Sequence, residues 1–326
     1  MLKVIIPVAG IGKRLRPHTY TLPKALIEVA GKPILGHILE RISKIDPQEV
    51  IIIVSHMEDK IKDYVAQNFK LNSSYVKQRE ALGLGHAIFL AKERVSAEEP
   101  LLIILGDTIL DANFYALCKS KTNMIGVKEI EDPRRFGIAE VDGDIVKRLV
   151  EKPSHPTTNL ALIGLYYIVD TDKLFESLNE IIERDIKTVG EYQLTDGLDL
   201  MLKKGNIFKI FNVDGWYDCG KPEALLDTNR YLLEKSHKLV EINGSIIIPP
   251  VFVHPSSNIE HSIIGPYVSI ASNSTIKYSI VSDSIINSGA YIERMLLSRS
   301  IIGSNAEVYG KYEHLDIGDS SKVNID

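Results

Sequence analysis

The chain has 326 residues, of which 44% are hydrophobic and 25% charged, and its formal net charge is -5. These proportions are typical of a soluble globular protein, and the length predicts about two domains. A net-acidic chain has no overall basic character, so we expect no nucleic-acid partner. The two cysteines, Cys118 and Cys219, are far apart, and no apolar run is long enough for a membrane span. We therefore expect a cytoplasmic protein with no disulfide framework and no membrane partner.

Strands and helices are predicted to alternate along the first part of the chain. Apolar runs indicate strands and amphipathic periodicity indicates helices. The expected order is strand 4–8, helix 34–43, strand 50–54, helix 57–68, strand 75–78, helix 87–94 and strand 101–105. This alternation is typical of an α/β fold with a doubly wound, mostly parallel, Rossmann-like sheet.

The periodicity changes after about residue 240. Aliphatic residues then recur at intervals of five or six, with small and polar residues between them: Val253, Ile259, Ile264, Ile270, Ile276, Val281, Ile286, Ile292, Leu297, Ile302 and Val308. Such a hexapeptide repeat predicts a parallel β-helix of about three coils with the aliphatic residues inside. A β-sandwich would instead alternate with period two. The predicted domains are residues 1–238 and residues 239–326.

The first predicted strand runs directly into a loop that carries glycines and cations. Residues 10–16 are Gly-Ile-Gly-Lys-Arg-Leu-Arg, and Lys24 follows. At the carboxyl end of a strand, backbone N–H groups and cationic side chains together favour phosphate. The loop matches neither the dinucleotide G-x-G-x-x-G motif nor the end of a P-loop. We interpret it as a phosphate site, and a solvated basic turn is the alternative.

Six motifs in order resemble the sugar-phosphate nucleotidylyltransferase family: residues 10–17, 23–24, Gln78 with 83–87, 105–107, 151–153 and 216–220. The chain is most similar to the glucose-1-phosphate thymidylyltransferase branch, in its long form with a C-terminal left-handed β-helix. The resemblance implies an enzyme that joins a nucleoside triphosphate, with dTTP favoured, to a hexose 1-phosphate, with glucose 1-phosphate favoured. The sugar phosphate would attack the α-phosphorus in line and release pyrophosphate, without a general base.

The same resemblance implies roles for individual residues. The expected catalytic residues are Arg14, Lys24 and Lys152. The expected nucleotide-binding residues are Ala9, Gly10, Gly12, Lys13, Gln78, Gly83 and Asp107, of which Gln78 and Gly83 would select a pyrimidine base. The expected sugar-phosphate-binding residues are Gly137, Glu151, Lys152, Gly164 and Tyr166. Asp107 and Asp218 are expected to hold Mg²⁺, a hard cation that prefers carboxylate oxygens.

Three positions depart from the thymidylyltransferase pattern. Ala9 replaces a loop glycine, as in UTP-using glucose-1-phosphate uridylyltransferases, and Lys13 replaces a threonine. Val189 stands where an arginine typically binds phosphate, and Lys187 and Arg184 are candidate substitutes. Both dTTP and UTP are therefore open, and a UTP-glucose-1-phosphate uridylyltransferase is the first alternative function.

Two further alternatives concern other classes of protein. A non-catalytic nucleotide-sugar sensor would bind the same ligand, although such relatives tend to lose the charged residues that this chain keeps. An acetyl-CoA-dependent acyltransferase could use the β-helix, with His254, His261 and His314 as the available bases. About three coils are short for that task, so we expect the β-helix to assemble a homo-oligomer instead.

Overall fold

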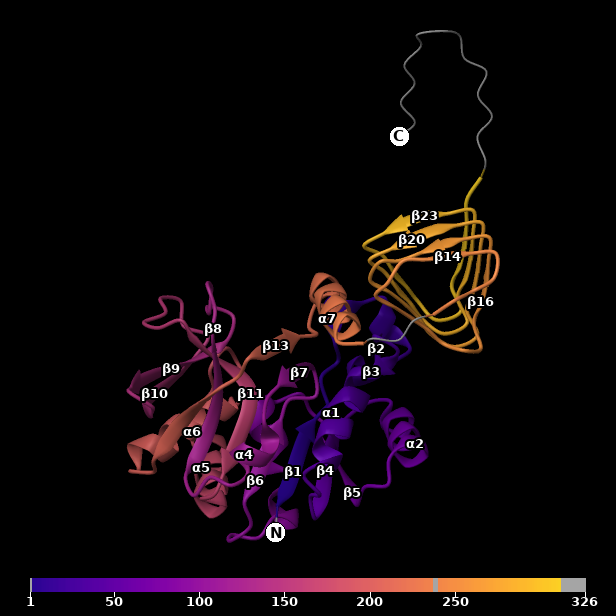
Figure 1. Cartoon of the computed structure of the whole chain (residues 1–326). Coiled ribbons are helices and arrows are strands. Elements are labelled where there is room, and N and C mark those ends of the chain that lie inside the picture. The colour runs from indigo at the N-terminus through magenta and orange to yellow at the C-terminus, as the bar shows by residue number, and fades with distance from the viewer. Residues whose placement is uncertain (1, 237–239, 312–326) are drawn as a thin grey trace. The chain divides into compact units, whose positions relative to one another are not determined.

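The computed structural model describes residues 2–236 and 240–311. The chain divides into two compact units, the larger formed by residues 1–27 and 32–228 and the smaller by residues 28–31 and 229–326. Figure 1 shows an α/β unit and a stack of short strands in yellow and orange. The predicted domain boundary between residues 238 and 239 lies outside the described residues.

The larger unit is built on a nine-stranded sheet in the order β5-β4-β1-β6-β11-β8-β12-β10-β9. Its first four strands are parallel: β5 (Ser73–Lys77), β4 (Glu49–Val54), β1 (Lys3–Pro7) and β6 (Leu101–Ile104). The chain runs from β1 outward to β4 and β5, then returns to β6 on the other side of β1. This reversal is the doubly wound order, and it confirms the Rossmann-like prediction.

The rest of the sheet adds antiparallel neighbours. Strand β11 (Leu160–Ile168) runs antiparallel to both β6 and β8 (Asn123–Glu129). Strand β12 (Phe208–Asn212) is parallel to β8, and β10 (Ile145–Glu151) is antiparallel to β12 and to β9 (Gly137–Asp142). The predicted elements stop at residue 105, so the sequence analysis did not anticipate this half of the sheet.

The helices agree closely with the early predictions. Helix α1 is Ile34–Ser43 and α2 is Glu58–Asn68. The predicted helix 87–94 is instead two elements, α3 (Leu84–Phe89) and a 3-10 turn at Lys92–Arg94. The remaining elements of this part of the chain are α4 (Phe114–Leu117), α5 (Thr171–Glu183), α6 (Leu194–Lys203), α7 (Pro222–Glu234), β2 (Glu28–Val29), β3 (Lys32–Pro33), β7 (Thr108–Asp111) and β13 (Gly215–Asp218).

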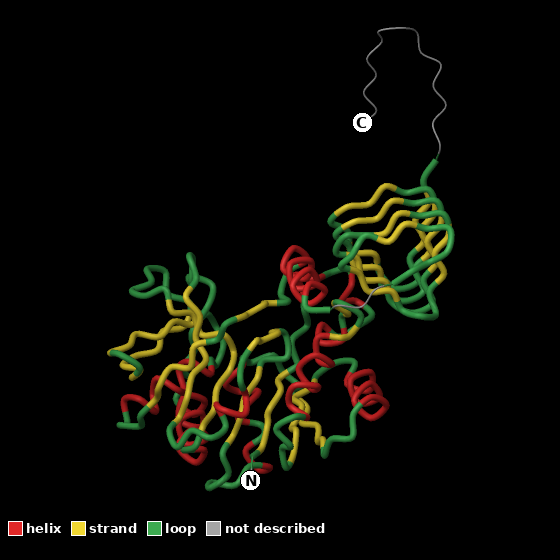
Figure 2. The backbone as a smooth tube through the Cα atoms, in the orientation of Figure 1, coloured by secondary structure: helices red, strands yellow, loops and turns green. Residues whose placement is uncertain are grey.

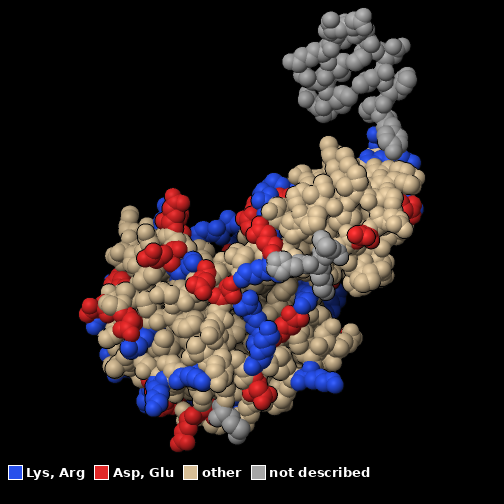
Figure 3. Space-filling model, viewed as in Figure 1, with Lys and Arg blue, Asp and Glu red and all other residues tan. Residues whose placement is uncertain are grey.

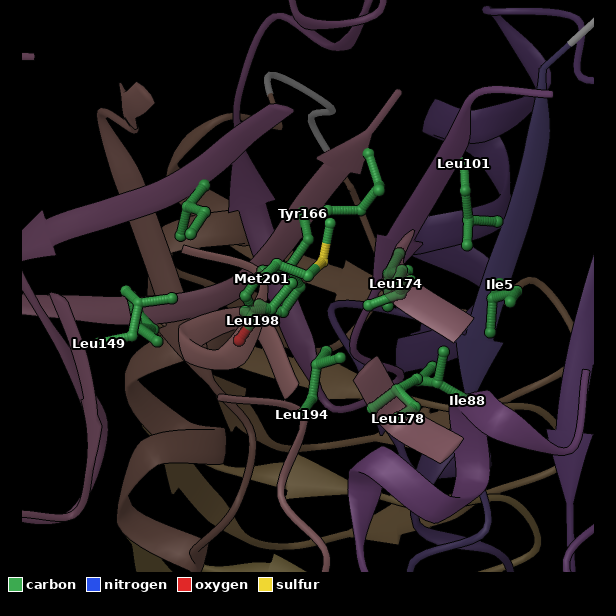
Figure 4. Close-up of a cluster of buried hydrophobic side chains, with 14 of the residues drawn as sticks. Ile5, Ile88, Leu101, Leu149, Tyr166, Leu174, Leu178, Leu194, Leu198 and Met201 are labelled. Atoms are coloured by element: carbon green, nitrogen blue, oxygen red, sulfur yellow. The ribbon is translucent and has the colours of Figure 1, made fainter. Parts of the chain in front are cut away.

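Helices α3, α5 and α6 pack with the sheet around one large hydrophobic core. Figure 4 shows Tyr166 of β11 within this cluster together with Leu198 and Met201 of α6. Alternate residues of β1 face opposite sides of the sheet, and Ile5 and Ile6 are both fully buried. Both faces of the central strands are therefore covered, as expected of parallel strands.

The smaller unit is a parallel β-helix, consistent with the left-handed form. Its three sheets are β14 (Ile246–Ile247), β17 (Ile263–Ile264), β20 (Ile280–Ser282), β23 (Leu296–Ser298); β15 (Val251–Val253), β18 (Val268–Ile270), β21 (Ile285–Ile286), β24 (Ile301–Ile302); and β16 (Asn258–Glu260), β19 (Thr275–Lys277), β22 (Tyr291–Glu293), β25 (Glu307–Tyr309). Each sheet is four strands deep, so the prediction of about three coils was wrong. The first coil begins at β14, before the first repeat residue recognised in the sequence, Val253.

The predicted repeat residues form the interior of this β-helix, whose coils the tube in Figure 2 traces. Ile264 and Val281 stack in register, are fully buried, and lie between Ile247 and Leu297 in the same column. On the face of the molecule in Figure 3, lysine and arginine are interspersed with aspartate and glutamate. In the part of the chain that the structure describes, every helix is too short or too polar to cross a bilayer.

Candidate active site

The loop after β1 lies at the point where the strand order reverses, between β1 and β6. Gly12 has a φ of +67°, and a Cβ atom there would lie 2.9 Å from Cγ2 of Thr19, so only glycine fits without strain. The Thr19 hydroxyl donates a 2.9 Å hydrogen bond to the Gly12 carbonyl, and Leu15 is fully buried beneath the loop. These contacts fix the backbone from which Arg14 projects.

A first cavity of about 460 Å³ opens at this loop. Its walls come from the loop after β1, the end of β5, the start of α3 and the end of β6. All the predicted nucleotide-binding residues line it, together with one predicted catalytic lysine: Ala9, Gly10, Gly12, Lys13, Gln78, Gly83, Asp107 and Lys24. The fold thus gathers around one space residues that are up to about a hundred positions apart in the sequence.

Gln78 and Gly83 meet at one end of the first cavity. Gln78 is 7% exposed, and its Nε2 donates a 3.1 Å hydrogen bond to the Gly83 carbonyl. Gly83 has a φ of +110°, and a Cβ there would lie 2.5 Å from the Tyr192 carbonyl oxygen. The same Nε2 lies 3.2 Å from Nδ1 of His86, a residue to which the sequence analysis gave no role.

A second cavity of about 720 Å³ adjoins the first. It is lined by the other predicted catalytic and metal residues and by every predicted sugar-phosphate residue: Arg14, Asp218, Gly137, Glu151, Lys152, Gly164 and Tyr166. The two cavities share five lining residues, namely Gly10, Leu84, Leu105, Asp107 and Glu191. A molecule in one cavity is therefore in reach of a molecule in the other.

Asp107 and Asp218 are brought together by a short antiparallel pair of strands. In the register of β13 with β7, Asp218 lies opposite Thr108, and the N–H of Cys219 donates a 2.9 Å hydrogen bond to the Asp107 carbonyl. Burial raises the pKa of Asp218, and the nearby charge of Asp107 raises it further. The two carboxylates therefore repel each other across a partly buried space.

Lys24 offsets part of this negative charge. Its Nζ lies 2.6 Å from Oδ2 of Asp107, and its side chain is 11% exposed. Burial alone would raise the pKa of Asp107, but the charge and hydrogen bond of Lys24, with a contribution from Arg14, hold it below its ordinary value. Asp107 is therefore an anion at neutral pH, and it holds Lys24, which lines the first cavity, next to the wall that the two cavities share.

A second ion pair lies on the far side of the second cavity. Lys152 Nζ is 3.1 Å from Oε1 of Glu151, and the Thr195 hydroxyl donates a 2.6 Å hydrogen bond to Oε2 of the same carboxylate. Lys152 has a φ of +43°, an uncommon backbone conformation for a residue with a side chain. Strained residues of this kind concentrate at functional sites, where the surrounding structure holds them.

The donor set fits a hard divalent cation. Two carboxylates that repel each other, Asp107 and Asp218, are what such an ion would neutralise, and Mg²⁺ usually binds one or two carboxylates and keeps several waters. Among the described residues, no group of three or more His, Cys, Asp or Glu side chains is arranged to hold a metal. A metal here would therefore complete its coordination with water and substrate oxygens.

Val189 stands where an arginine was expected to bind phosphate, and the two candidate substitutes, Lys187 and Arg184, lie outside both cavities. Lys187 pairs with Asp185 at 2.6 Å and Arg184 with Glu180 at 2.9 Å, and neither lines either cavity. Arg16, one of the loop cations, lies over the Tyr20 ring instead, 4.8 Å from its centroid.

Sequence reasoning missed two side chains that line the second cavity, Arg135 and Trp216. Within residues 2–236 and 240–311, Arg135 forms no ion pair, and its charge lowers the pKa of Asp218 against the larger effect of burial. The Trp216 Nε1 is buried without a hydrogen-bond partner among those residues. The neighbouring Phe136 contacts the Trp216 ring edge to face, with centroids 4.8 Å apart. Trp216 falls inside a recognised motif, whereas Arg135 has no such signal.

Comparison with known proteins places this site in a family. Residues 3–235 match the model for nucleotidyl transferases. The chain is 34% identical over 243 residues to the low-salt glycan biosynthesis nucleotidyltransferase Agl11 of Haloferax volcanii, a match that covers 72% of this chain and 66% of that protein. It is 35% identical over 247 residues to the bifunctional protein GlmU of Methanocaldococcus jannaschii, covering 75% of this chain and 57% of GlmU. The chain thus spans less than two thirds of the length of these curated relatives.

Other matches extend over whole proteins. The UTP–glucose-1-phosphate uridylyltransferase AglF of Haloferax volcanii is 26% identical over 251 residues, which cover 74% of this chain and 100% of AglF. Among solved structures, a putative glucose-1-phosphate thymidylyltransferase from Bacillus anthracis superposes with a TM-score of 0.62 at 26% identity, covering 74% of this chain and 98% of that one. From the family match over most of its length, we conclude that the chain belongs to the nucleotidyl transferase family.

Proposed function

We propose that this protein is a sugar-1-phosphate nucleotidylyltransferase, with the nucleoside triphosphate in the first cavity and the sugar phosphate in the second. The observation that carries this proposal is that two adjoining cavities share Asp107, which is paired with Lys24 of the first cavity, while Arg14 and Lys152 line the second. Two polyanions can react only if cations offset their repulsion where they meet. Lys24 in the first cavity and Arg14 and Lys152 in the second would supply that positive charge on either side of the shared residues.

In the proposed reaction, an oxygen of the sugar phosphate forms a bond to the α-phosphorus. The bond from that phosphorus to the bridging oxygen of the β-phosphate breaks, and pyrophosphate leaves with the electron pair. The nucleophile is already an anion at neutral pH, so no proton has to be removed. Lys152 would orient the attacking phosphate and Lys24 would contact the α-phosphate. The loop amides would bind the departing phosphates, and Arg14 would reach them from the wall of the second cavity.

Mg²⁺ is the proposed metal, with Asp107 and Asp218 as its protein ligands. When bound, it would neutralise phosphate charge and orient the triphosphate. In its absence the two carboxylates would repel the incoming triphosphate, so their own proximity argues for a cation between them.

The proposed base is thymine or uracil. The family resemblance favours dTTP, whereas Ala9 and the similarity to AglF, whose name specifies UTP, favour UTP. Glucose 1-phosphate is the proposed sugar substrate. Glu151 would accept hydrogen bonds from sugar hydroxyls, and Tyr166 offers an aromatic face at the wall of the second cavity.

The decisive experiment is a substrate panel. The protein would be incubated with Mg²⁺, glucose 1-phosphate and each of dTTP, UTP, CTP, ATP and GTP in turn, and pyrophosphate release would be followed. We expect release with dTTP or UTP. No release with any triphosphate, across several hexose 1-phosphates, would refute the catalytic proposal and favour a nucleotide-sugar sensor.

We also propose that residues 1–238 form the catalytic domain and that residues 239–326 assemble copies of this chain into a homo-oligomer. The outer face of the sheet β14-β17-β20-β23 carries one aliphatic side chain per coil: Ile246, Ile263, Ile280 and Leu296. Leu296 is 78% exposed and Ile246 59%. A continuous exposed aliphatic column is unusual on a monomer, and a second copy of the same face would cover it.

A further inference from the structure

The amide of Gln78 is oriented by two acceptors, one of which has no assigned role. Its Nε2 lies 3.1 Å from the Gly83 carbonyl oxygen and 3.2 Å from Nδ1 of His86. A carbonyl oxygen can only accept, so the nitrogen of the amide, and not its oxygen, must face Gly83. This assignment follows from the hydrogen-bond network.

The orientation of Gln78 in turn fixes the state of His86. Since the Gln78 nitrogen is a donor, Nδ1 of His86 must accept, which requires a neutral imidazole with its proton on Nε2. Burial lowers the pKa of His86, with the charge of Glu80 opposing, so the ring is neutral at neutral pH. The two hydrogens of the Gln78 amide are then donated to the Gly83 carbonyl oxygen and to Nδ1 of His86.

What remains for a ligand is one acceptor and one donor. Within the described parts of the chain, the Gln78 Oε1 and the Gly83 N–H have no hydrogen-bond partner, and both residues line the first cavity. An acceptor beside a donor matches the imide edge shared by uracil and thymine, which presents an N3–H next to a carbonyl oxygen. A rotated amide would instead present two donors, which match the N3 and O2 acceptors of cytosine.

We propose that His86 is a positioning residue for base selection: it holds the Gln78 amide in the one orientation that pairs with an imide base. The inference rests on the proposed function, because it takes the first cavity as the nucleotide site. His86 lies on α3 behind Gln78, does not line either cavity, and acts only through Gln78. It is therefore distinct from a residue that touches the base itself.

The test compares His86→Ala, which removes the acceptor, with His86→Asn, whose side-chain oxygen can accept near the position of Nδ1. The control is His254→Ala, because His254 follows β15 in the β-helix, lines neither cavity, and has its Nδ1 2.8 Å from the Ser256 hydroxyl. Steady-state pyrophosphate release gives kcat and KM with dTTP, UTP and CTP. Titration calorimetry gives the affinity for the same triphosphates without turnover.

We expect His86→Ala to lower kcat/KM for dTTP and UTP about tenfold, mainly by raising KM. A change of about this size is expected when one hydrogen bond is lost. The decrease in kcat/KM with CTP should be smaller, so the variant should prefer dTTP and UTP over CTP less strongly than the wild type does. His86→Asn should recover most of the loss, and His254→Ala should match the wild type. Equal affinity and equal base preference in wild type and His86→Ala would overturn the proposal, as would equal defects in the Ala and Asn variants.

Failure of the proposed function has a different signature. A wild type that binds dTTP or UTP but releases no pyrophosphate would refute the catalytic proposal, and the calorimetric comparison of the variants would still decide the role of His86. A wild type that binds no triphosphate would overturn both.

Discussion

The substitution Lys24→Met tests the central electrostatic claim. Lys24 is partly buried in the wall of the first cavity, and its Nζ is 2.6 Å from Oδ2 of Asp107, which lines both cavities. Methionine keeps most of the side-chain volume and removes the charge. The variant therefore isolates what the positive charge of Lys24 contributes to the proposed reaction.

The expected size of the effect follows from the position of the charge. A cation about 4 Å from a phosphate charge contributes about 4 kcal/mol at an effective dielectric constant of about 20. The Asp107 side chain beside it is 38% exposed and already neutralises part of the lysine charge, so a smaller value applies. We expect kcat to fall by about a hundredfold, at the lower end of the effect of removing one charge-stabilising donor from an active site.

The assay is steady-state pyrophosphate release at pH 8, with the metal concentration varied. Loss of Lys24 removes a cation that lowers the pKa of both Asp107 and Asp218, so both pKa values should rise, and the alkaline pH of the assay opposes the resulting protonation. The apparent metal affinity should not fall, because the site becomes more negative. Lys60→Met is the control, since Lys60 is exposed and donates to the Thr21 carbonyl. A folded Lys24→Met variant with kcat within about threefold of wild type would refute the reasoning.

Three further predictions concern other parts of the molecule. Chelation should abolish pyrophosphate release, and added Mg²⁺ should restore it. Asp218→Asn should weaken the apparent Mg²⁺ affinity at least about tenfold. Unchanged activity in excess chelator would contradict the metal proposal. Arg135→Met should raise KM for the sugar phosphate about tenfold or more, which is the effect expected when a charge-assisted hydrogen bond to the phosphate is lost. The control Arg184→Met should leave this KM unchanged. Equal KM values in the two variants would exclude Arg135 as a phosphate ligand. The double substitution Ile280→Glu and Leu296→Glu should yield monomers in light scattering, and an unchanged mass would show that this face does not join the copies.

The sequence was sufficient for the parts of the fold that depend on local patterns. The apolar runs of β1, β4 and β6 and the amphipathic α1 appear where periodicity predicts them. The direction in which a strand pairs is a different property. The run Leu160–Ile168 is apolar almost throughout, and nothing in it indicates that it lies antiparallel to both of its neighbours. Pairing direction is decided by the path of the connections, which composition does not record.

The candidate site divides in the same way. The loop from Ala9 to Gly12 carries its own chemical signal, and family resemblance supplied distant residues such as Lys152. No role was predicted for Arg135 or His86, because each acquires one only through its neighbours in the fold: the second cavity for Arg135 and the Gln78 amide for His86. A histidine on a short helix has no distinctive pattern until the fold brings Nδ1 within 3.2 Å of the Gln78 amide. Contacts of this kind become visible only in three dimensions.

The shared wall of the two cavities has a thermodynamic consequence. Asp107 and Glu191 belong to both spaces, so neither of the two proposed substrates would have a complete enclosure of its own. Whichever molecule arrives first supplies part of the surface that the second one contacts, and it displaces water from it. If the triphosphate strengthens the binding of the sugar phosphate by some factor, the sugar phosphate must strengthen the binding of the triphosphate by the same factor. If the two substrates repel each other instead, each must weaken the binding of the other by the same factor, so an affinity measured for either one alone differs from its affinity in the presence of the other.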